Sequence, residues 1–338
     1  MTAKPRIALI PGDPAGIGPE LVAKLLAEPE TAERADILLV GDACVFDRGA
    51  AQAGQALART EIADPAAEAW WEAPAYAWLA MQTLAPKEME TAAVSEAGGR
   101  SSLRTLERAL DLAVAGVVDA VLFAPFNKAS LHLAGLGHDD ELHYMGAYLG
   151  AAGYLSELNT LDGIWTSRVT SHIPLSAVAG AIEPGRILAA IRMADTTLRR
   201  AGYARPRIAV AALNPHAGDN GNFGREEIDI IAPAVREAAR AQIAVDGPWP
   251  SDTVFLKAKA GEVDAVVTMY HDQGQIALKL MGFDRGVTVQ GGLPVPVATP
   301  AHGTAFDIAG RGVADPGATR AALGVACAMA RDWTRAVG

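Results

Sequence analysis

The chain has few cysteines and no long apolar run. Cys44 and Cys327 are its two cysteines, far apart and outside any C-x-x-C spacing, so neither a disulfide framework nor a zinc-thiolate centre is expected. No stretch approaches the roughly 20 apolar residues of a membrane span. The apolar run near the N-terminus is cut by Pro11 and Gly12, which argues against a signal peptide. We therefore expect a cytoplasmic protein that does not enter the membrane.

The chain has fewer basic than acidic residues. The sequence has 29 Lys and Arg against 39 Asp and Glu, a formal charge of −10. This balance argues against non-specific nucleic-acid binding, although a few local cations could still hold an anionic small molecule. The composition, 50% hydrophobic and 20% charged, is typical of globular proteins, and the length of 338 residues suggests two domains or lobes.

Short apolar runs alternate with longer helical patterns. The runs are apolar nearly throughout, as in strands that are covered on both faces. We predict strands over 6–12, 36–42, 119–125, 168–174, 207–215 and 264–272. Helices are predicted over 19–29, where Pro19 can begin the helix, over 101–116, with a serine start and a glycine stop, and over 226–242. The alternation predicts an α/β protein with a largely parallel sheet.

Three predicted strands end in a histidine. His172, His216 and His271 stand at the carboxyl ends of their strands, where α/β sheets bind ligands. Imidazole is a common ligand of divalent transition metals, and three imidazoles with an open position form one kind of catalytic site. A single histidine of this kind is more often a hydrogen-bonded loop residue, but the threefold recurrence favours a metal site.

Acidic residues accompany the histidines. Asp272 follows His271 and could orient it or touch the substrate. Asp252 in GPWPSDT could do the same, or could cap a helix. The glycine-rich turn at 11–20 is either an anion site at a helix start or simply a tight turn. The segment 301–316, AHGTAFDIAGRGVADP, has small residues that would let the backbone approach a flat or phosphorylated ligand.

Taken together, these motifs resemble the PdxA family, 4-hydroxythreonine-4-phosphate dehydrogenase-like enzymes of vitamin B6 biosynthesis. The resemblance covers nearly the whole chain. It rests on GDPAGIGPE near the start, then APFNKASL (124–131), GHDDE (137–141), TSHIPL (170–175), NPHAGDNGNFGREEID (214–229), GPWPSDT (247–253), YHDQG (270–274) and HGTAFDIAGRG (302–312). It implies an isopropylmalate/isocitrate dehydrogenase-like fold of two α/β lobes with an active-site cleft between them. The cofactor-side lobe would be 1–132 with 286–338, and the metal, substrate and dimerisation lobe 133–285.

The resemblance also implies a set of site residues. His172, His216 and His271 match the family's metal ligands, and in a homodimer His271 would come from the partner chain. His138, Lys279 and Asp252 match positions that contact substrate, and Lys279, Asp252 and Asp272 are the expected catalytic residues. NAD, or possibly NADP, would lie against a loop that contains His302, Gly303, Thr304, Ala305, Asp307 and Asp315. Asp315 would repel a 2′-phosphate, which favours NAD. The metal could be zinc, cobalt or nickel, or magnesium or manganese if the substrate chelates it.

Three positions depart from the family pattern at the substrate's anionic end. Asp139 stands where a threonine is usual, Thr288 replaces an asparagine, and Val297 replaces an arginine. Losing a bidentate arginine and gaining a carboxylate weakens a phosphate site. Two hydroxy-acid substrates therefore compete: 4-hydroxythreonine-4-phosphate or a related phosphorylated acid, oxidised with loss of CO2, and a non-phosphorylated acid such as a carboxylated cis-dihydrodiol. A catalytically silent small-molecule binding protein is the alternative from another class, and the role of the aromatic segment 69–82 stays open.

Overall fold

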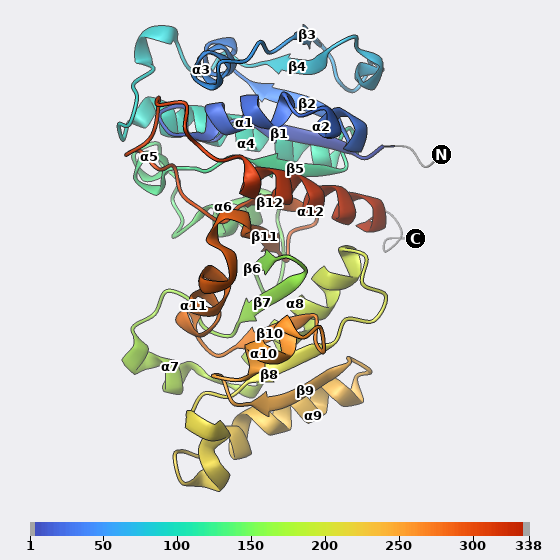
Figure 1. Cartoon of the computed structure of the whole chain (residues 1–338), viewed down its shortest axis with the longest axis vertical. Helices are drawn as coiled ribbons and strands as arrows, with labels where there is room; N and C mark the ends of the chain where they lie inside the picture. The colour runs from blue at the N-terminus through green and yellow to red at the C-terminus, as the bar shows by residue number, and fades with distance from the viewer. Residues whose placement is uncertain (1–3, 334–338) are drawn as a thin grey trace. The chain divides into compact units, whose positions relative to one another are not determined.

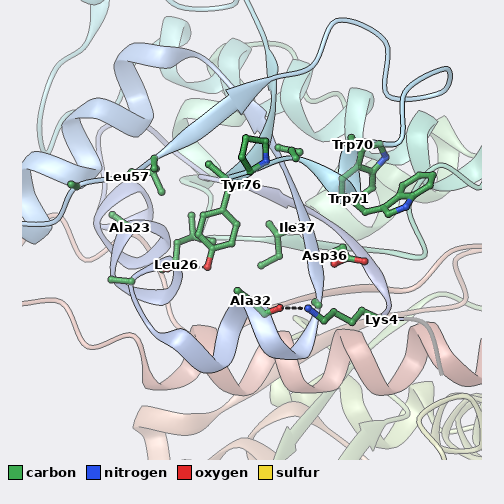
Figure 2. Close-up of a pocket in the computed structure, with 18 residues that line it drawn as sticks. Lys4, Ala23, Leu26, Ala32, Asp36, Ile37, Leu57, Trp70, Trp71 and Tyr76 are labelled. Carbon is green, nitrogen blue, oxygen red and sulfur yellow. Dashed lines mark hydrogen bonds between the residues drawn. The ribbon is translucent and has the colours of Figure 1, made fainter. Parts of the chain in front are cut away.

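A computed structural model describes residues 4–333 of the chain. The chain divides into two compact units, one formed by residues 1–152 and 293–338 and the other by residues 153–292 (Figure 1). The first is here called unit 1 and the second unit 2. These boundaries, after residues 152 and 292, lie later than the lobe boundaries expected after residues 132 and 285. The GHDDE segment therefore belongs to unit 1, together with the helices α5 (Lys128–Leu133) before it and α6 (Glu141–Tyr148) after it.

Unit 1 contains a parallel sheet in the order β3-β4-β2-β1-β5-β12. Its strands are β1 (Arg6–Ile10), β2 (Asp36–Gly41), β3 (Arg59–Glu61), β4 (Tyr76–Ala80), β5 (Ala120–Phe123) and β12 (Val297–Pro300). Its helices are α1 (Gly18–Leu26), α2 (Pro29–Arg34), α3 (Ala43–Ala53), α4 (Glu96–Val114), α5 (Lys128–Leu133), α6 (Glu141–Tyr148) and α12 (Gly317–Trp333), with the short turns η1 (Trp70–Glu72) and η2 (Pro86–Glu88). The residues of β5 are all buried, as expected for a strand covered on both faces.

Unit 2 has strands in the order β11-β6-β7-β10-β8-β9. The pairs β11–β6 and β6–β7 are antiparallel, and β7, β10, β8 and β9 are parallel. The strands are β6 (Ser156–Leu161), β7 (Ile164–Arg168), β8 (Ile208–Ala211), β9 (Val245–Trp249), β10 (Ala265–Thr268) and β11 (Val287–Gly291). The helices are α7 (Leu175–Ala181), α8 (Pro184–Arg200), α9 (Ala232–Arg240), α10 (Val254–Lys259) and α11 (His271–Gly282), with the shorter η3 (Pro215–Gly221), η4 (Glu227–Ile231) and η5 (Phe283–Arg285).

The α/β class predicted from the sequence is confirmed, and five of the six predicted strands match β1, β2, β5, β8 and β10. The strand predicted over 168–174 is wrong, since β7 ends at Arg168. The strand at this place, β7, lies earlier in the sequence than predicted. Asp162 and Gly163, with φ of 48° and 86°, form a two-residue hairpin turn between β6 and β7, so β7 begins directly after them.

Two further boundaries differ from the prediction. The predicted strand 264–272 ends at Thr268, and His271 instead begins α11. The helix predicted over 101–116 begins earlier, at Glu96, because Ser95 Oγ caps it by accepting a hydrogen bond from Gly98 N at 3.0 Å. Within the described residues, no helix is long and apolar enough to cross a membrane.

Candidate metal and substrate site

The three candidate metal ligands all lie in unit 2, after adjacent parallel strands. His172 follows β7, His216 follows β8 and His271 follows β10, and β10 lies between β7 and β8 in the sheet. Carboxyl ends of parallel strands meet at one edge of a sheet. The topology therefore puts all three histidine-bearing loops at the same edge of unit 2.

His172 and His271 are close neighbours within one chain. Their ring centroids are 5.5 Å apart and their planes make an angle of 42°. Two imidazoles that share one tetrahedral ion, with metal–nitrogen bonds of about 2.0–2.1 Å, would have centroids roughly 5 Å apart. The resemblance implied that His271 would join the site from a partner chain, whereas here it lies beside His172 of its own chain.

Asp272 lies within hydrogen-bond distance of the His271 ring. Its carboxylate oxygen Oδ1 lies 2.7 Å from Nδ1 of His271. Hydrogen bonding at Nδ1 favours the tautomer with a proton on that nitrogen and leaves Nε2 with a free lone pair. A carboxylate in this position is the usual companion of a metal-binding histidine. The predicted orienting role of Asp272 therefore has a matching hydrogen bond.

His216 lies in a turn with unusual backbone geometry. Residues 216–220 all have positive φ, and four of these five residues are not glycine. Left-handed conformation costs a non-glycine residue about 1–2 kcal/mol, so the surrounding structure must hold the turn in place. His172 is also left-handed, with φ of 51°. Two of the three candidate ligands thus lie on strained backbone, which is typical of functional sites.

The Glu227 carboxylate is hydrogen-bonded to the residues just before the His216 turn. Only 2% of this residue is exposed, and its Oε1 accepts hydrogen bonds from the backbone N–H groups of Leu213 at 2.9 Å and Asn214 at 2.7 Å. Its Oε2 accepts from the side-chain amide of Asn214 at 3.0 Å. A buried carboxylate with several such donors is well satisfied. Glu227 therefore fixes the chain just before His216.

Further hydrogen bonds tie the loops together. The Gln273 side chain accepts from Met269 N at 2.8 Å and donates to Ala212 O at 2.9 Å, which joins the ends of β10 and β8. Thr170 Oγ1 donates to Met269 O at 2.8 Å, which joins the ends of β7 and β10. The loops that carry the histidines are therefore linked to one another directly.

The donor chemistry fits a divalent transition metal. The site offers imidazole nitrogens, and one of the histidines is hydrogen-bonded to a carboxylate, a donor set of the kind that zinc and cobalt prefer. In residues 4–333, however, no three His, Cys, Asp or Glu side chains gather closely enough to hold an ion. One chain thus presents two candidate ligands side by side, with His216 on a neighbouring loop.

The other predicted residues of unit 2 differ in accessibility. Lys279 on α11 and Asp252 are exposed. Asp252 does not cap α10, whose N-cap residue is Thr253. Thr288 is only 7% exposed on β11 and accepts a hydrogen bond from Asn159 Nδ2 at 2.9 Å, so its hydroxyl already has a partner inside unit 2.

The predicted substrate-binding residues of unit 1 lie in two places, the turn before α6 and the strand β12. His138 and Asp139 are exposed in the turn before α6, and the His138 ring lies 6.0 Å from that of Tyr144. The neighbouring Asp140 caps α6, and although burial raises its pKa, hydrogen bonds from His143 outweigh that effect and lower it. Val297 is fully buried in β12 beside β5, so its side chain belongs to the core of unit 1.

The predicted cofactor loop is anchored at both ends. Near its start, Thr304 O accepts a hydrogen bond from Ile17 N at 3.1 Å, and a side chain at Gly16 would meet Thr304 Cβ at 2.8 Å. The turn at 11–20 therefore packs against the loop. His302 and Ala305 are half-buried, Gly303 and Asp307 are exposed, and Asp315 accepts from Gly317 N at 2.8 Å.

Several structural supports were missed by the sequence analysis. Glu227, Gln273 and Arg168 all hold the histidine loops, but none was singled out as a site residue. One signal was available: Arg168 is a charged residue in the otherwise uncharged stretch IWTSRVTSHIP. A buried charge so close to a candidate ligand is itself informative.

Comparison with known proteins gives the chain a family. The family of the pyridoxal phosphate biosynthetic protein PdxA matches residues 33–326. A Pseudomonas aeruginosa protein, provisionally named 4-hydroxythreonine-4-phosphate dehydrogenase 2, is 55% identical over 337 residues, covering 97% of each chain. The D-threonate 4-phosphate dehydrogenase of Salmonella typhimurium is 40% identical over 309 residues, covering 91% of this chain and 94% of its own.

Solved structures agree. The crystal structure of 4-hydroxythreonine-4-phosphate dehydrogenase from Klebsiella pneumoniae has a TM-score of 0.86 and 37% identity, covering 98% of this chain and 99% of its own. A terephthalate 1,2-cis-dihydrodiol dehydrogenase from Burkholderia xenovorans has a TM-score of 0.66 and 29% identity, covering 94% and 96%. The fold and these matches define the class, which is that of the dehydrogenases, oxidoreductases with an α/β fold. Within it, the chain belongs to the PdxA family.

Proposed function

We propose that the chain is a metal-dependent, NAD-linked dehydrogenase that oxidises a secondary hydroxyl of a small hydroxy acid. The observation that carries this proposal is the close pair His172 and His271, with Asp272 bonded to the second ring. The site thus offers imidazole donors at the sheet edge where α/β enzymes bind their ligands. Membership of a dehydrogenase family supports the reaction type.

The chain's own residues have distinct roles in this proposal. An ion held by His172, His216 and His271 would act as a Lewis acid towards the substrate hydroxyl. Asp272 keeps the His271 ring in the tautomer that leaves Nε2 unprotonated. The exposed Lys279 binds an anionic group of the substrate or polarises its carbonyl, and Asp252 contacts the substrate. After oxidation, the β-keto acid loses CO2 because the carbonyl accepts the electron pair of the C–C bond that breaks, and the resulting enolate then takes up a proton at carbon.

NAD is the proposed cofactor, and the segment 302–315 is its proposed binding loop. Hydride transfer is the chemistry that the nicotinamide supplies. Asp315 is exposed and would repel the 2′-phosphate of NADP. The contact between Ile17 N and Thr304 O holds the start of this loop on the turn before α1.

We also propose that a second copy of the chain completes the metal site. An exposed large apolar side chain follows each candidate ligand within seven residues of the sequence: Ile173 is 39% exposed, Phe223 52% and Ile276 58%. Leu175 and Leu280 are exposed by 70% and 84%. Apolar residues gathered around a functional site are typical of a surface that another protein covers. A homodimer would bury them and bring further imidazoles to the pair.

Two substrate types follow from the family and from this chain's departures. The first is 4-hydroxythreonine-4-phosphate or D-threonate 4-phosphate, the substrates named for its relatives. The second is a carboxylated cis-dihydrodiol, which is favoured by the replacement of the family's arginine with the buried Val297 and by the similarity to the terephthalate dihydrodiol enzyme.

NADH formation with each substrate type tests the proposal. Turnover of a phosphorylated acid would support the first substrate and a role in vitamin B6 or related metabolism. Turnover of the dihydrodiol, with none of the phosphorylated acids, would rule that role out. A protein that binds these acids but reduces no NAD with any of them would be a silent binding protein.

A further inference from the structure

A buried arginine stands four residues before the first histidine of the pair. Arg168, the last residue of β7, is only 6% exposed, although arginine is rarely buried without a partner. Its Nη2 donates to Glu157 Oε2 at 2.5 Å, its Nη1 to Asn159 Oδ1 at 3.0 Å and its Nε to Ser171 Oγ at 3.0 Å. All three nitrogens of the guanidinium are thus engaged. The planar fork of arginine suits such a fixed arrangement, and lysine could not reproduce it.

Arg168 reaches the first histidine through Ser171. Ser171 immediately precedes His172, whose φ of 51° is unfavourable for a residue with a side chain. A strained residue keeps its conformation only where neighbouring contacts fix it. The bond from Arg168 Nε to Ser171 Oγ supplies such a contact next to the strained position.

The same network reaches the second histidine through Asn159. Asn159 Oδ1 accepts from Arg168 Nη1 and also from Gln275 Nε2, at 2.5 Å. Gln275 lies four residues after His271 on α11, and residues four apart lie on the same face of a helix. Asn159 therefore links β7, which leads to His172, with the helix that begins at His271.

Thr288 completes the network. Asn159 Nδ2 donates to Thr288 Oγ1 at 2.9 Å, so the amide of Asn159 uses both of its ends. Asn159 and Thr288 are both buried. Thr288 stands where the family pattern has an asparagine. This substituted residue is therefore hydrogen-bonded to Asn159, which belongs to the network beside the histidines.

We infer that Arg168 is a positioning residue that holds the His172 ring in place through Ser171 and the His271 ring through Asn159 and Gln275. This inference rests on the proposed metal role of the two histidines. If Arg168 and Glu157 were only a stabilising ion pair, any change that kept their charges would leave the rings in place. If the network positions the rings, loss of the Nη1 and Nε bonds is enough to disturb them.

Arg168→Lys separates these two cases, because it keeps the positive charge beside Glu157 and removes the fork. The measurement is the affinity of the purified protein for Co²⁺ alone, followed by the visible absorption of the bound ion, which reports its ligand geometry. Loss of residues that support metal ligands usually weakens metal binding about 10–100-fold. We expect a loss in that range for Arg168→Lys, with an altered cobalt spectrum.

The matched control is Arg207→Lys. Arg207 also pairs with a carboxylate in unit 2, donating to Asp264 at 2.7 and 3.1 Å, but at the opposite, amino ends of β8 and β10. It should leave Co²⁺ affinity and spectrum unchanged. Gln275→Leu is a second test variant, since it cuts only the link to α11 at a half-buried position and should also weaken binding.

The outcomes distinguish the inference from the proposed function. If the wild-type protein binds Co²⁺ and both Arg168→Lys and Gln275→Leu bind it with the same affinity and spectrum, the positioning role is refuted while the metal site stands. If Arg207→Lys weakens binding as much as Arg168→Lys, the effect is general destabilisation and the inference also fails. If the wild-type protein binds no Co²⁺, the proposed metal function fails first and the inference with it.

Discussion

Gly218 lies in the left-handed turn of residues 216–220 and packs against the Glu227 carboxylate. Replacing it therefore tests whether Glu227 stabilises this turn. Gly218 has φ of +79°, and a Cβ added there would lie 2.6 Å from Glu227 Oε2 and 3.2 Å from Gly224 O. Gly218→Ala should therefore push the Glu227 carboxylate away from the backbone N–H groups that it holds. The matched control is Gly261→Ala, since Gly261 has φ of +72° and nothing within 4 Å of the added Cβ.

The free energies of unfolding of Gly218→Ala and Gly261→Ala are expected to differ. Left-handed backbone alone costs an alanine about 1–2 kcal/mol, and both variants pay this cost. Gly218→Ala also weakens hydrogen bonds to a buried carboxylate, which contribute about 1.5–3 kcal/mol each. If one such bond is lost, unfolding by urea should show Gly218→Ala to be about 1.5–3 kcal/mol less stable than Gly261→Ala.

Metal binding gives an independent reading of the same variants. Gly218 lies two residues after His216, so Gly218→Ala should weaken Co²⁺ binding, whereas Gly261→Ala should not. Equal losses of stability in the two variants, within about 0.5 kcal/mol, would refute the role of Glu227 as the support of this turn, because the two would then differ in nothing but position.

Three further predictions concern other parts of the chain. Lys279→Ala should still fold, because the side chain is exposed and outside the core, yet lose turnover; normal turnover and substrate affinity would remove both of its proposed roles. Burial raises the pKa of the Cys327 thiol to about 11, so a thiol reagent should modify it at neutral pH only after unfolding, and prompt labelling of Cys327 in a native Cys44→Ser variant would contradict its buried position. Lys24 Nζ donates to Gly312 O at 2.9 Å and to Ala314 O at 2.7 Å, and both carbonyls belong to the proposed cofactor loop. Lys24→Met should therefore lower the affinity for NADH, measured by its fluorescence, and an unchanged affinity would contradict a role of these hydrogen bonds in cofactor binding.

The sequence predicted the strands whose apolar runs are bounded by clear breakers. Strand β1 ends at Ile10 before Pro11 and Gly12, and β10 begins after Asp264. Strand β7 was misplaced because its residues, IWTSR, are mixed in polarity, and its true boundary is the Asp162-Gly163 turn. An Asp-Gly pair between two strands is a strong hairpin signal, and it would have corrected the prediction.

The position of the histidines could be predicted, but their support could not. A histidine at the end of an apolar run is visible in the sequence, and parallel topology brings such ends to one edge. The hydrogen bonds from Arg168 to Asn159 and from the Leu213 N–H to Glu227 join residues whose meeting depends on strand order and on the left-handed turn. Neither feature follows from local propensity, because tertiary contacts and not sequence preference stabilise them.

Dependence of NADH formation on a bound metal ion tests the central claim most directly. The protein is stripped with a chelator, assayed with phosphorylated hydroxy acids and with a carboxylated cis-dihydrodiol, and assayed again after addition of Zn²⁺ or Co²⁺, with His271→Ala carried through the same steps. We expect the stripped protein to form no NADH, the reloaded protein to recover activity with one substrate type, and His271→Ala to stay inactive. Activity that survives stripping, or recovers equally in His271→Ala, would contradict a metal site built on these histidines.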